Sequence, residues 1–294
     1  MMILGTNYMK SFGITTRQNG YSNDYNPDIN PSITNEFSTA AFRYGHSLIQ
    51  GTIQLFSENG AVSTINLRDH WFSPHLLKQG KLDDFLRSLT RQPSQGSDSF
   101  LSQEISNHLF QTSKFSFGQD LGSFNIQRGR DHGLATYNDI RTLCGLPRAS
   151  RFNDITDQIP QHFVERLQSV YRSVDDIDFF VAGLMEHHVH GSHVGHTFLC
   201  IIGDQFARLK KGDRYFYDLG GQAGSFSEGQ LQEIRRSSWA RIVCDNGDNI
   251  RSIQPLAFKF EDNQRNRAVD CNSPQIPRMN LNLWRTERPQ PQGI

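Results

Sequence analysis

The residue with the clearest capacity for chemistry is a histidine, His46, near the end of the stretch from Asn35 to Ile49. An imidazole nitrogen can bind a metal ion. Arg43 precedes His46 by three residues, so both side chains leave a helix on the same side. Gly45 beside them leaves room for a flat group. These residues predict a metal-bearing helix. The alternative is a half-buried histidine that only hydrogen-bonds a backbone carbonyl.

The sequence around His46 has the pattern of a helix that could hold these side chains. Apolar residues recur at intervals of three and four, as on one helix face; they are Phe37, Ala40, Ala41, Tyr44 and Leu48. Pro31 and Ser32 precede this pattern, and proline is tolerated in a first helical turn. We therefore expect one helix that begins near Pro31, ends near Ile49 and buries its apolar face.

A second stretch strengthens the case for a ligand. It runs Phe124-Asn-Ile-Gln-Arg-Gly-Arg-Asp-His-Gly-Leu-Ala-Thr-Tyr-Asn138. Together with Phe42-Arg-Tyr-Gly-His46 it resembles the animal haem peroxidases, the family of myeloperoxidase, lactoperoxidase and peroxidasin. The resemblance continues through residues 137–147, 197–206, 211–217 and 240–249 and covers nearly the whole chain. It implies a mainly α fold of the haem peroxidase type, and a reaction in which hydrogen peroxide oxidises a small organic or halide donor.

The resemblance also implies roles for four residues. His46 matches the proximal axial ligand of the haem iron, and Asn125 matches the residue that accepts a hydrogen bond from its other ring nitrogen. Such a bond fixes the imidazole tautomer and ring plane. Arg43 and Arg128 match the arginines that hold the haem propionates, which suits a planar, permanently charged guanidinium. The alternative for both arginines is a surface ion pair. The implied cofactor is haem b, with calcium possible in a longer parent protein.

The distal half of a peroxidase site is not evident in this sequence. Members of the family carry a distal histidine, a distal arginine and two carboxylates that esterify the haem, all well upstream of the proximal helix. None of these motifs occurs in residues 1–45, so no catalytic residue is assigned in this chain. We expect a fold that is incomplete at its N-terminus. Two alternatives stay open: a noncatalytic haem-binding or interaction protein on the same scaffold, and a metal binder unrelated to peroxide.

That last alternative comes from a histidine-rich tract, His187-His-Val-His-Gly-Ser-His-Val-Gly-His196. Converging histidine rings can bind zinc or copper. No cysteine or carboxylate stands at zinc-ligand spacing, and a turn between helices directs such side chains outward. We therefore expect a solvated loop here. We also treat His132 as structural.

Composition limits the partners. Thirty Lys and Arg balance thirty Asp and Glu without a dense basic run, which argues against nucleic acid and anionic membrane surfaces. No apolar run approaches membrane-spanning length, and residues 1–10 are too short and polar for a secretory signal. The length suits one partial peroxidase domain over residues 1–294, with an irregular lead-in at 1–30 and a flexible tail at 286–294.

Four cysteines allow three pairings, and they show no Cys-x-x-Cys metal motif. The family resemblance implies the pairs Cys144–Cys200 and Cys244–Cys271. It also implies a protein of the extracellular space or the secretory-pathway lumen, with a role in the response to oxidative stress. The alternative is four buried free thiols in a cytosolic protein.

The remaining pattern predicts mostly helices and one small hairpin. Thr52–Phe56 and 61–67 flank Asn59 and Gly60, a pair that favours a tight turn. One expected helix carries Asn125 and Arg128 and ends at Asp131. The other helices are expected over residues 82–89, 102–118, 137–143, 161–171, 176–186, 194–209 and 227–244.

Overall fold

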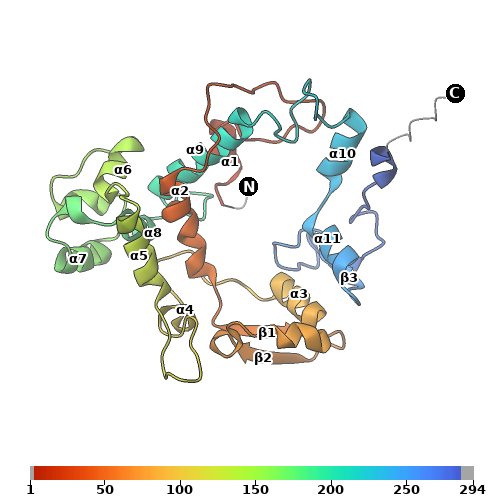
Figure 1. The fold of residues 1–294 in the computed structure, drawn as a ribbon, viewed down its shortest axis with the longest axis horizontal. Coiled ribbons are helices and arrows are strands. Elements are labelled where there is room, and N and C mark those ends of the chain that lie inside the picture. The colour runs from red at the N-terminus through yellow and green to blue at the C-terminus, as the bar shows by residue number, and fades with distance from the viewer. Residues whose placement is uncertain (1–2, 286–294) are drawn as a thin grey trace, which may run out of the picture.

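The computed structural model describes residues 3–285, and it is mainly helical with a small β-hairpin, as the sequence predicts (Figure 1). The α-helices are α1 (Thr6–Ser11), α2 (Asn35–Thr39), α3 (Leu82–Arg91), α4 (Gln103–Ser106), α5 (Leu121–Asp131), α6 (Tyr137–Leu143), α7 (Gln161–Val170), α8 (Phe179–Met185), α9 (His196–Gly212), α10 (Glu228–Arg236) and α11 (Trp239–Asn246). The 3₁₀ helices are η1 (Ala41–Leu48), η2 (Leu67–His70), η4 (Phe152–Asp157), η5 (Val174–Asp176) and η6 (Leu281–Trp284), and η3 (Leu77–Lys81) is a π-helical turn. The strands are β1 (Thr52–Phe56), β2 (Val62–Asn66), β3 (Ser252–Ile253) and β4 (Val269–Asp270).

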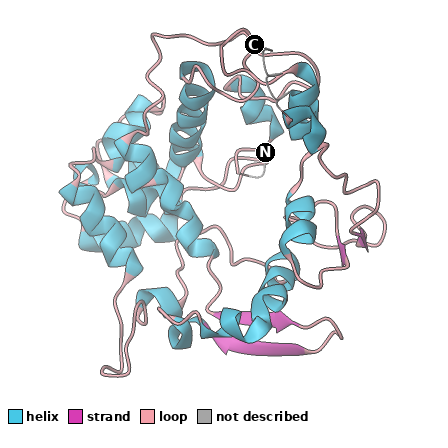
Figure 2. Ribbon diagram, turned by 45° about the vertical axis from the view of Figure 1, so that its right-hand side comes forward, coloured by secondary structure: helices cyan, strands magenta, loops and turns pink. Residues whose placement is uncertain are grey.

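The helices form groups around the middle of the molecule, as Figures 1 and 2 show. Helices α5 to α8 lie together on one side, α9 lies beside α1 and α2, and α10 and α11 lie on the opposite side. The larger hydrophobic core joins residues of α2, η1, α6, α8 and α9, and its fully buried members include Tyr137, Phe179 and Phe198. A smaller core gathers around α11 and β3, with Ile253 and Ile276 buried. The predicted proximal segment therefore lies against the larger core.

The hairpin predicted after the His46 segment is confirmed. Strands β1 and β2 pair antiparallel with Thr52 opposite Asn66, and Gly60 in the connecting turn has φ of 84°. A left-handed backbone of this kind is easily adopted by glycine. The side chain of Gln92, just after α3, accepts from the Gln54 N–H and donates to the Thr52 carbonyl. These bonds fasten α3 to β1.

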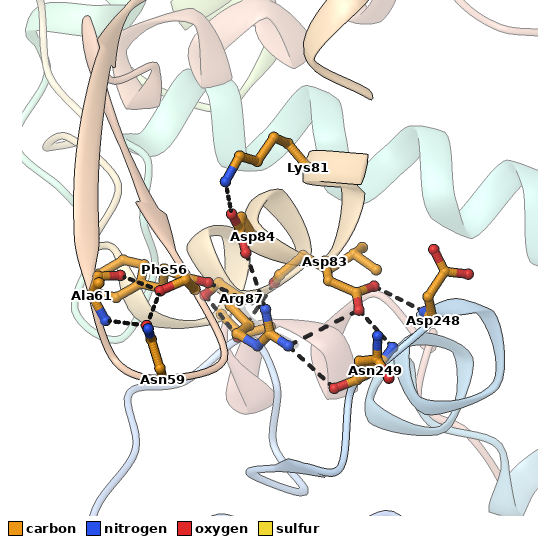
Figure 3. Close-up of polar contacts among 12 residues, drawn as sticks. Phe56, Asn59, Ala61, Lys81, Asp83, Asp84, Arg87, Asp248 and Asn249 are labelled. Carbon is orange, nitrogen blue, oxygen red and sulfur yellow. Dashed lines mark hydrogen bonds and ion pairs between the residues drawn. The ribbon is translucent and has the colours of Figure 1, made fainter. Parts of the chain in front are cut away.

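A polar junction joins α3 to the loop that follows α11 (Figure 3). The buried Asp83 carboxylate accepts from the backbone N–H groups of Asp248 and Asn249, at 2.9 and 2.6 Å. Arg87, one turn later, donates to the Asn249 carbonyl at 3.2 Å and to the Phe56 carbonyl at 3.3 Å. One helix therefore binds the hairpin and the C-terminal region together.

The segment around His46 differs from the expected continuous helix. An α-helix, α2, covers Asn35–Thr39, and a 3₁₀ helix, η1, covers Ala41–Leu48. Ala40 between them has φ of −134° and ψ of −69°, outside the helical region, and it is fully buried. Burial of this alanine and its neighbour in the core decides the local geometry over intrinsic helix propensity. Because 3₁₀ geometry aligns residues three apart, Arg43 and His46 still share one face.

Three further expectations were wrong about the extent of helices. In the lead-in expected to be irregular, Thr6–Ser11 form α1. Of the helix expected over 102–118, only Gln103–Ser106 is helical, because the chain then turns back and pairs Leu109 with Gln119. The helix expected over 227–244 is two helices, α10 and α11. The side chain of Ser238 accepts from the Arg241 N–H and starts a new helix, the usual action of an N-cap serine.

Two disulfides link elements that are distant in sequence. Cys144, at the end of α6, is bonded to Cys200 in α9, and Cys244 in α11 is bonded to Cys271. This is the pairing implied by the family resemblance. Within residues 3–285, no helix is both long and apolar enough to cross a membrane. The tail expected at 286–294 lies outside the described residues.

Candidate cofactor site

Two segments that are far apart in sequence bring three of the predicted site residues into contact. Helix α5 places Asn125 against η1, where its amide nitrogen lies 3.0 Å from Nδ1 of His46. The amide oxygen of Asn125 accepts from an Nη of Arg43, also at 3.0 Å. Arg43 is held from its other side, because its Nε donates to the Ser38 carbonyl at 3.0 Å. The chain Arg43–Asn125–His46 is therefore a continuous hydrogen-bonded unit.

The orientation of the Asn125 amide differs from the expected one. The sequence comparison predicts that its oxygen accepts from His46, whereas the structure turns its nitrogen toward Nδ1 of His46. Arg43 explains this, because a guanidinium only donates hydrogen bonds and so must face the amide oxygen. Asn125 is fully buried, which leaves its amide few other partners.

The electrostatic surroundings of His46 favour the neutral form of its imidazole. Burial lowers the pKa of His46, the positive charge of Arg43 lowers it further, and the hydrogen bond to Asn125 opposes them in part. A neutral imidazole is the form that binds metal. The Nε2 atom makes no hydrogen bond to any other residue of 3–285. One ring nitrogen is thus held by the protein and the other is available.

A surface hollow lies beside this unit and carries two positive charges. Its lining consists of Arg43, Leu121, Phe124, Gln127, Arg128, Asp131 and His132. Arg128 is exposed, and its guanidinium makes no ion pair or hydrogen bond within the described part of the chain, so it is free to bind an anion. Burial and the nearby charge of Arg128 lower the pKa of Arg43. Phe124 is 44% exposed, which adds an apolar surface next to the charges.

Comparison with known proteins identifies the family of the chain. The sequence profile described as "Animal haem peroxidase" matches residues 1–258. The chain therefore belongs to the animal haem peroxidase family. It is 44% identical to the chorion peroxidase of Drosophila melanogaster, over 97% of this chain and 35% of that protein. It is 37% identical to the human peroxidasin homolog, over 90% of this chain and 18% of that one.

A solved peroxidase structure has a similar fold. Peroxidase A from Dictyostelium discoideum superposes with a TM-score of 0.67 at 31% identity, over 87% of this chain and 46% of that chain. The chain thus spans less than half the length of each of these three relatives. Membership of the family implies a haem cofactor.

The histidine-rich tract of this haem peroxidase chain is a loop between α8 and α9, as expected. His187, His188 and His190 are exposed. His196 begins α9, and its Nε2 lies 2.9 Å from the Cys144 carbonyl, so this nitrogen carries the proton. Within residues 3–285, no cluster of three or more His, Cys, Asp or Glu could hold a metal ion. His132 lies beside Asn35 and caps α5.

Sequence reasoning missed a buried carboxylate, Glu186. Its Oε1 accepts from the Tyr137 hydroxyl at 2.9 Å, and its Oε2 accepts from the N–H and hydroxyl of Thr197 at 2.8 and 3.0 Å. Burial raises the pKa of Glu186 to about 7. These residues join α6, the end of α8 and α9 close to the Cys144–Cys200 disulfide. No local pattern in the sequence signals a contact between residues this far apart.

Proposed function

We propose that this chain forms the proximal side of the haem site of a peroxidase, with His46 as the axial ligand of the iron. The observation that carries this proposal is the pairing of His46 with the buried Asn125, which leaves Nε2 without a protein partner. Second-sphere hydrogen bonds of this kind orient ligand histidines. The proposed cofactor is haem b, and the proposed substrates are hydrogen peroxide and a small organic or halide donor.

The residues around His46 fit a haem group in their chemistry. A haem combines an apolar ring with two carboxylates. The hollow lined by Arg43 offers an apolar surface on Leu121 and Phe124 and two guanidinium groups on Arg43 and Arg128, and Asp131 adds one carboxylate to its lining. Arginine binds carboxylates through paired, charge-assisted hydrogen bonds. We therefore assign Arg43 and Arg128 to the propionates.

When bound, haem supplies a redox-active iron at which peroxide can react. The part of this chain is to hold the iron from the proximal side, through His46, and to hold the propionates. A distal base that takes the proton of peroxide must come within hydrogen-bond reach of it. We assign that role to no residue of this chain. A noncatalytic haem-binding or interaction protein on the same scaffold is the alternative, and we propose calcium only as a ligand of a longer parent protein.

The two disulfides support an oxidising compartment, so we propose that the protein works outside the cell or in the secretory-pathway lumen. We propose one partial peroxidase domain over residues 1–294, of which the family match covers residues 1–258.

A haem titration of the purified chain tests the iron ligand. We expect His46→Ala to abolish the ligand-field spectrum of a histidine-bound iron, because no other ring nitrogen lies in this hydrogen-bonded unit. His188→Ala, in the exposed loop, is the matched control and should bind haem as the unchanged chain does. An unaltered ligand-field spectrum in His46→Ala would remove His46 from the site.

A further inference from the structure

We propose that the outer edge of strand β2 is a docking edge, at which a second copy of this chain adds its own β2. Two two-stranded hairpins then form one four-stranded antiparallel sheet, in the order β1–β2 followed by β2–β1 of the second copy. A two-fold axis passes through Thr64 at the centre of the strand. This inference does not depend on the proposed haem ligand.

The edge of β1 that faces away from β2 is closed by side chains. Gln92 accepts from the Gln54 N–H at 2.9 Å and donates to the Thr52 carbonyl at 2.7 Å. Arg87 donates to the Phe56 carbonyl at 3.3 Å. Figure 1 places α3 beside β1 and places β2 at the margin of the molecule. No strand can therefore be added to the hairpin on the β1 side without breaking these bonds.

The outer edge of β2 is open. In an antiparallel pair, residues that bond across the ladder alternate with residues whose backbone groups point away from it. The bond from the Leu67 N–H to the Gly51 carbonyl fixes this alternation, so the N–H groups of Val62, Thr64 and Asn66 point outward. Within residues 3–285, no hydrogen bond reaches these three N–H groups or the carbonyls of Val62 and Thr64. All three residues are exposed.

The sequence of β2 gives this edge none of the usual protection against pairing. Edge strands in soluble proteins commonly carry charged side chains, proline or a bulge. The strand Val62-Ser-Thr-Ile-Asn66 has no charged residue, no proline and no glycine, and its β-branched residues favour the strand conformation. A two-stranded hairpin is only marginally stable, and further strands stabilise it. The edge is thus a template for another strand.

A second copy of the chain fits this template. With the axis at Thr64, each Thr64 lies opposite its counterpart, and each Val62 lies opposite Asn66 of the second copy. Threonine pairs stabilise antiparallel strands, and no like charges meet in this register. The chain has 30 Lys and Arg and 30 Asp and Glu, so two copies do not repel each other through their net charge.

Sedimentation velocity of the full 294-residue chain over a concentration series measures the association. One pair of strands is a small interface, so we expect a monomer–dimer equilibrium with a dissociation constant on the order of 100 μM. Thr64→Pro removes the central donor of each copy and should leave only monomer. The hairpin should persist, because the Thr64 N–H makes no bond to β1 and proline is tolerated on an edge strand. Thermal unfolding checks that this variant is folded.

Charged residues at position 64 test the register. Thr64→Lys should weaken the dimer about fivefold, because two like charges then lie directly opposite each other. Thr64→Glu should do the same, and an equimolar mixture of the two variants should associate at least as tightly as the unchanged chain. Thr112→Lys, in the exposed loop before α5, is the matched control and should leave the dimer unaltered.

Amide hydrogen exchange followed by NMR locates the interface in the unchanged chain. The N–H groups of Val62, Thr64 and Asn66 should exchange more slowly as the protein concentration rises. Those of Ser63 and Ile65 face β1, so their protection should not depend on concentration and serves as the internal reference.

Two results would overturn the proposal. One is a chain that stays monomeric throughout the series, including a monomer that binds an added extended peptide at β2 in place of a second copy. The other is a dimer that neither Thr64→Pro nor Thr64→Lys weakens, since its interface would then lie on another surface.

Discussion

At the scale of single residues, Asn125 determines what His46 can do. It is buried between two helical segments, and both ends of its amide are engaged. An amide of this kind interacts with an imidazole more weakly than a carboxylate does, so it leaves the ligand less electron-donating. The presence of asparagine or aspartate at position 125 should therefore affect the reduction potential of the iron.

The replacement Asn125→Asp should lower the reduction potential of the haem-loaded chain. A carboxylate accepts more strongly from the imidazole, makes it more donating and favours ferric iron. Spectroelectrochemical titration measures the potential. Asn263→Asp makes the same charge change at an exposed position and should leave the potential unaltered. An upward shift in Asn125→Asp would contradict the role proposed for this residue.

Glu186 gives a second residue-scale expectation, this time for stability. Its pKa is raised by burial to about 7 in the folded chain, from an ordinary value near 4.5. The protonated form is thus favoured by folding, and the associated stability is complete below about pH 4 and lost as the pH rises through 7. Two to three pKa units correspond to roughly 3 kcal/mol.

Glu186→Gln should remove the loss of stability with rising pH, because glutamine cannot ionise. Its amide offers an oxygen to Thr197 and an NH₂ group to the Tyr137 hydroxyl, which can accept. We expect the variant to gain stability relative to the unchanged chain between pH 5 and pH 8. Denaturant unfolding with the disulfides intact, at both pH values, measures the difference. An equal effect of the replacement at both pH values would show that Glu186 does not change its protonation state between them, and it would contradict the raised pKa.

At the scale of elements, predictions from the sequence succeeded where a local pattern decides the structure. The bounds of α6 agree with those expected, and the Thr136 side chain caps its start by accepting from the Asp139 N–H. The hairpin follows from Asn59 and Gly60. The split at Ser238 was missed, because a serine inside a polar helix does not by itself show that it caps.

In the candidate site, too, the sequence predicted what local similarity shows and missed what depends on contacts between distant residues. The identities of Arg43, Asn125 and His46 came from a resemblance in sequence. The direction of the Asn125 amide did not, because it depends on a contact between Arg43 and a residue 82 positions later. Glu186 was missed for the same reason, since Tyr137 and Thr197 meet it only after three helices pack.

The two disulfides give a prediction at this scale. Protein made in an oxidising compartment should contain Cys144–Cys200 and Cys244–Cys271 and no free thiol. The first link closes a separation of 56 residues, and in the chain-entropy model its loss lowers the free energy of unfolding by about 4 kcal/mol. Peptide mapping without reduction checks the pairing. Recovery of Cys144 linked to Cys244 or Cys271 would overturn it.

At the scale of the whole molecule, a large apolar hollow is open on the inner side of α3. Its lining includes Leu89, Phe258 and Phe260, which are 69%, 64% and 63% exposed. Exposed apolar surface of this extent favours association. The same chain spans 35% of the chorion peroxidase that it resembles.

We assign no distal base in this chain, and this bears on catalysis by the 294-residue chain alone. We expect it to turn over peroxide no faster than free haem at equal concentration. A proximal ligand tunes the iron, but cleavage of the O–O bond is accelerated from the opposite face, where a positioned base contributes a factor on the order of 10² to 10⁴. We do not assign that base to the exposed histidines of the 187–196 loop, because no hydrogen bond among the described residues joins them to the Arg43–Asn125–His46 unit.

Steady-state oxidation of a phenolic dye by the haem-titrated chain measures its rate of peroxide turnover, with free haem and haem plus imidazole as references. His46→Ala provides the matched variant, because it removes the ligand and leaves the exposed histidines in place. Turnover close to both references, and little altered in His46→Ala, is the expected result. Saturable turnover a hundredfold above both, lost in His46→Ala, would mean that the chain assembles a distal base of its own. Since such a base must reach a peroxide held on the iron, the two histidines that line the large hollow by α3, His190 and His193, would then be the first residues to replace.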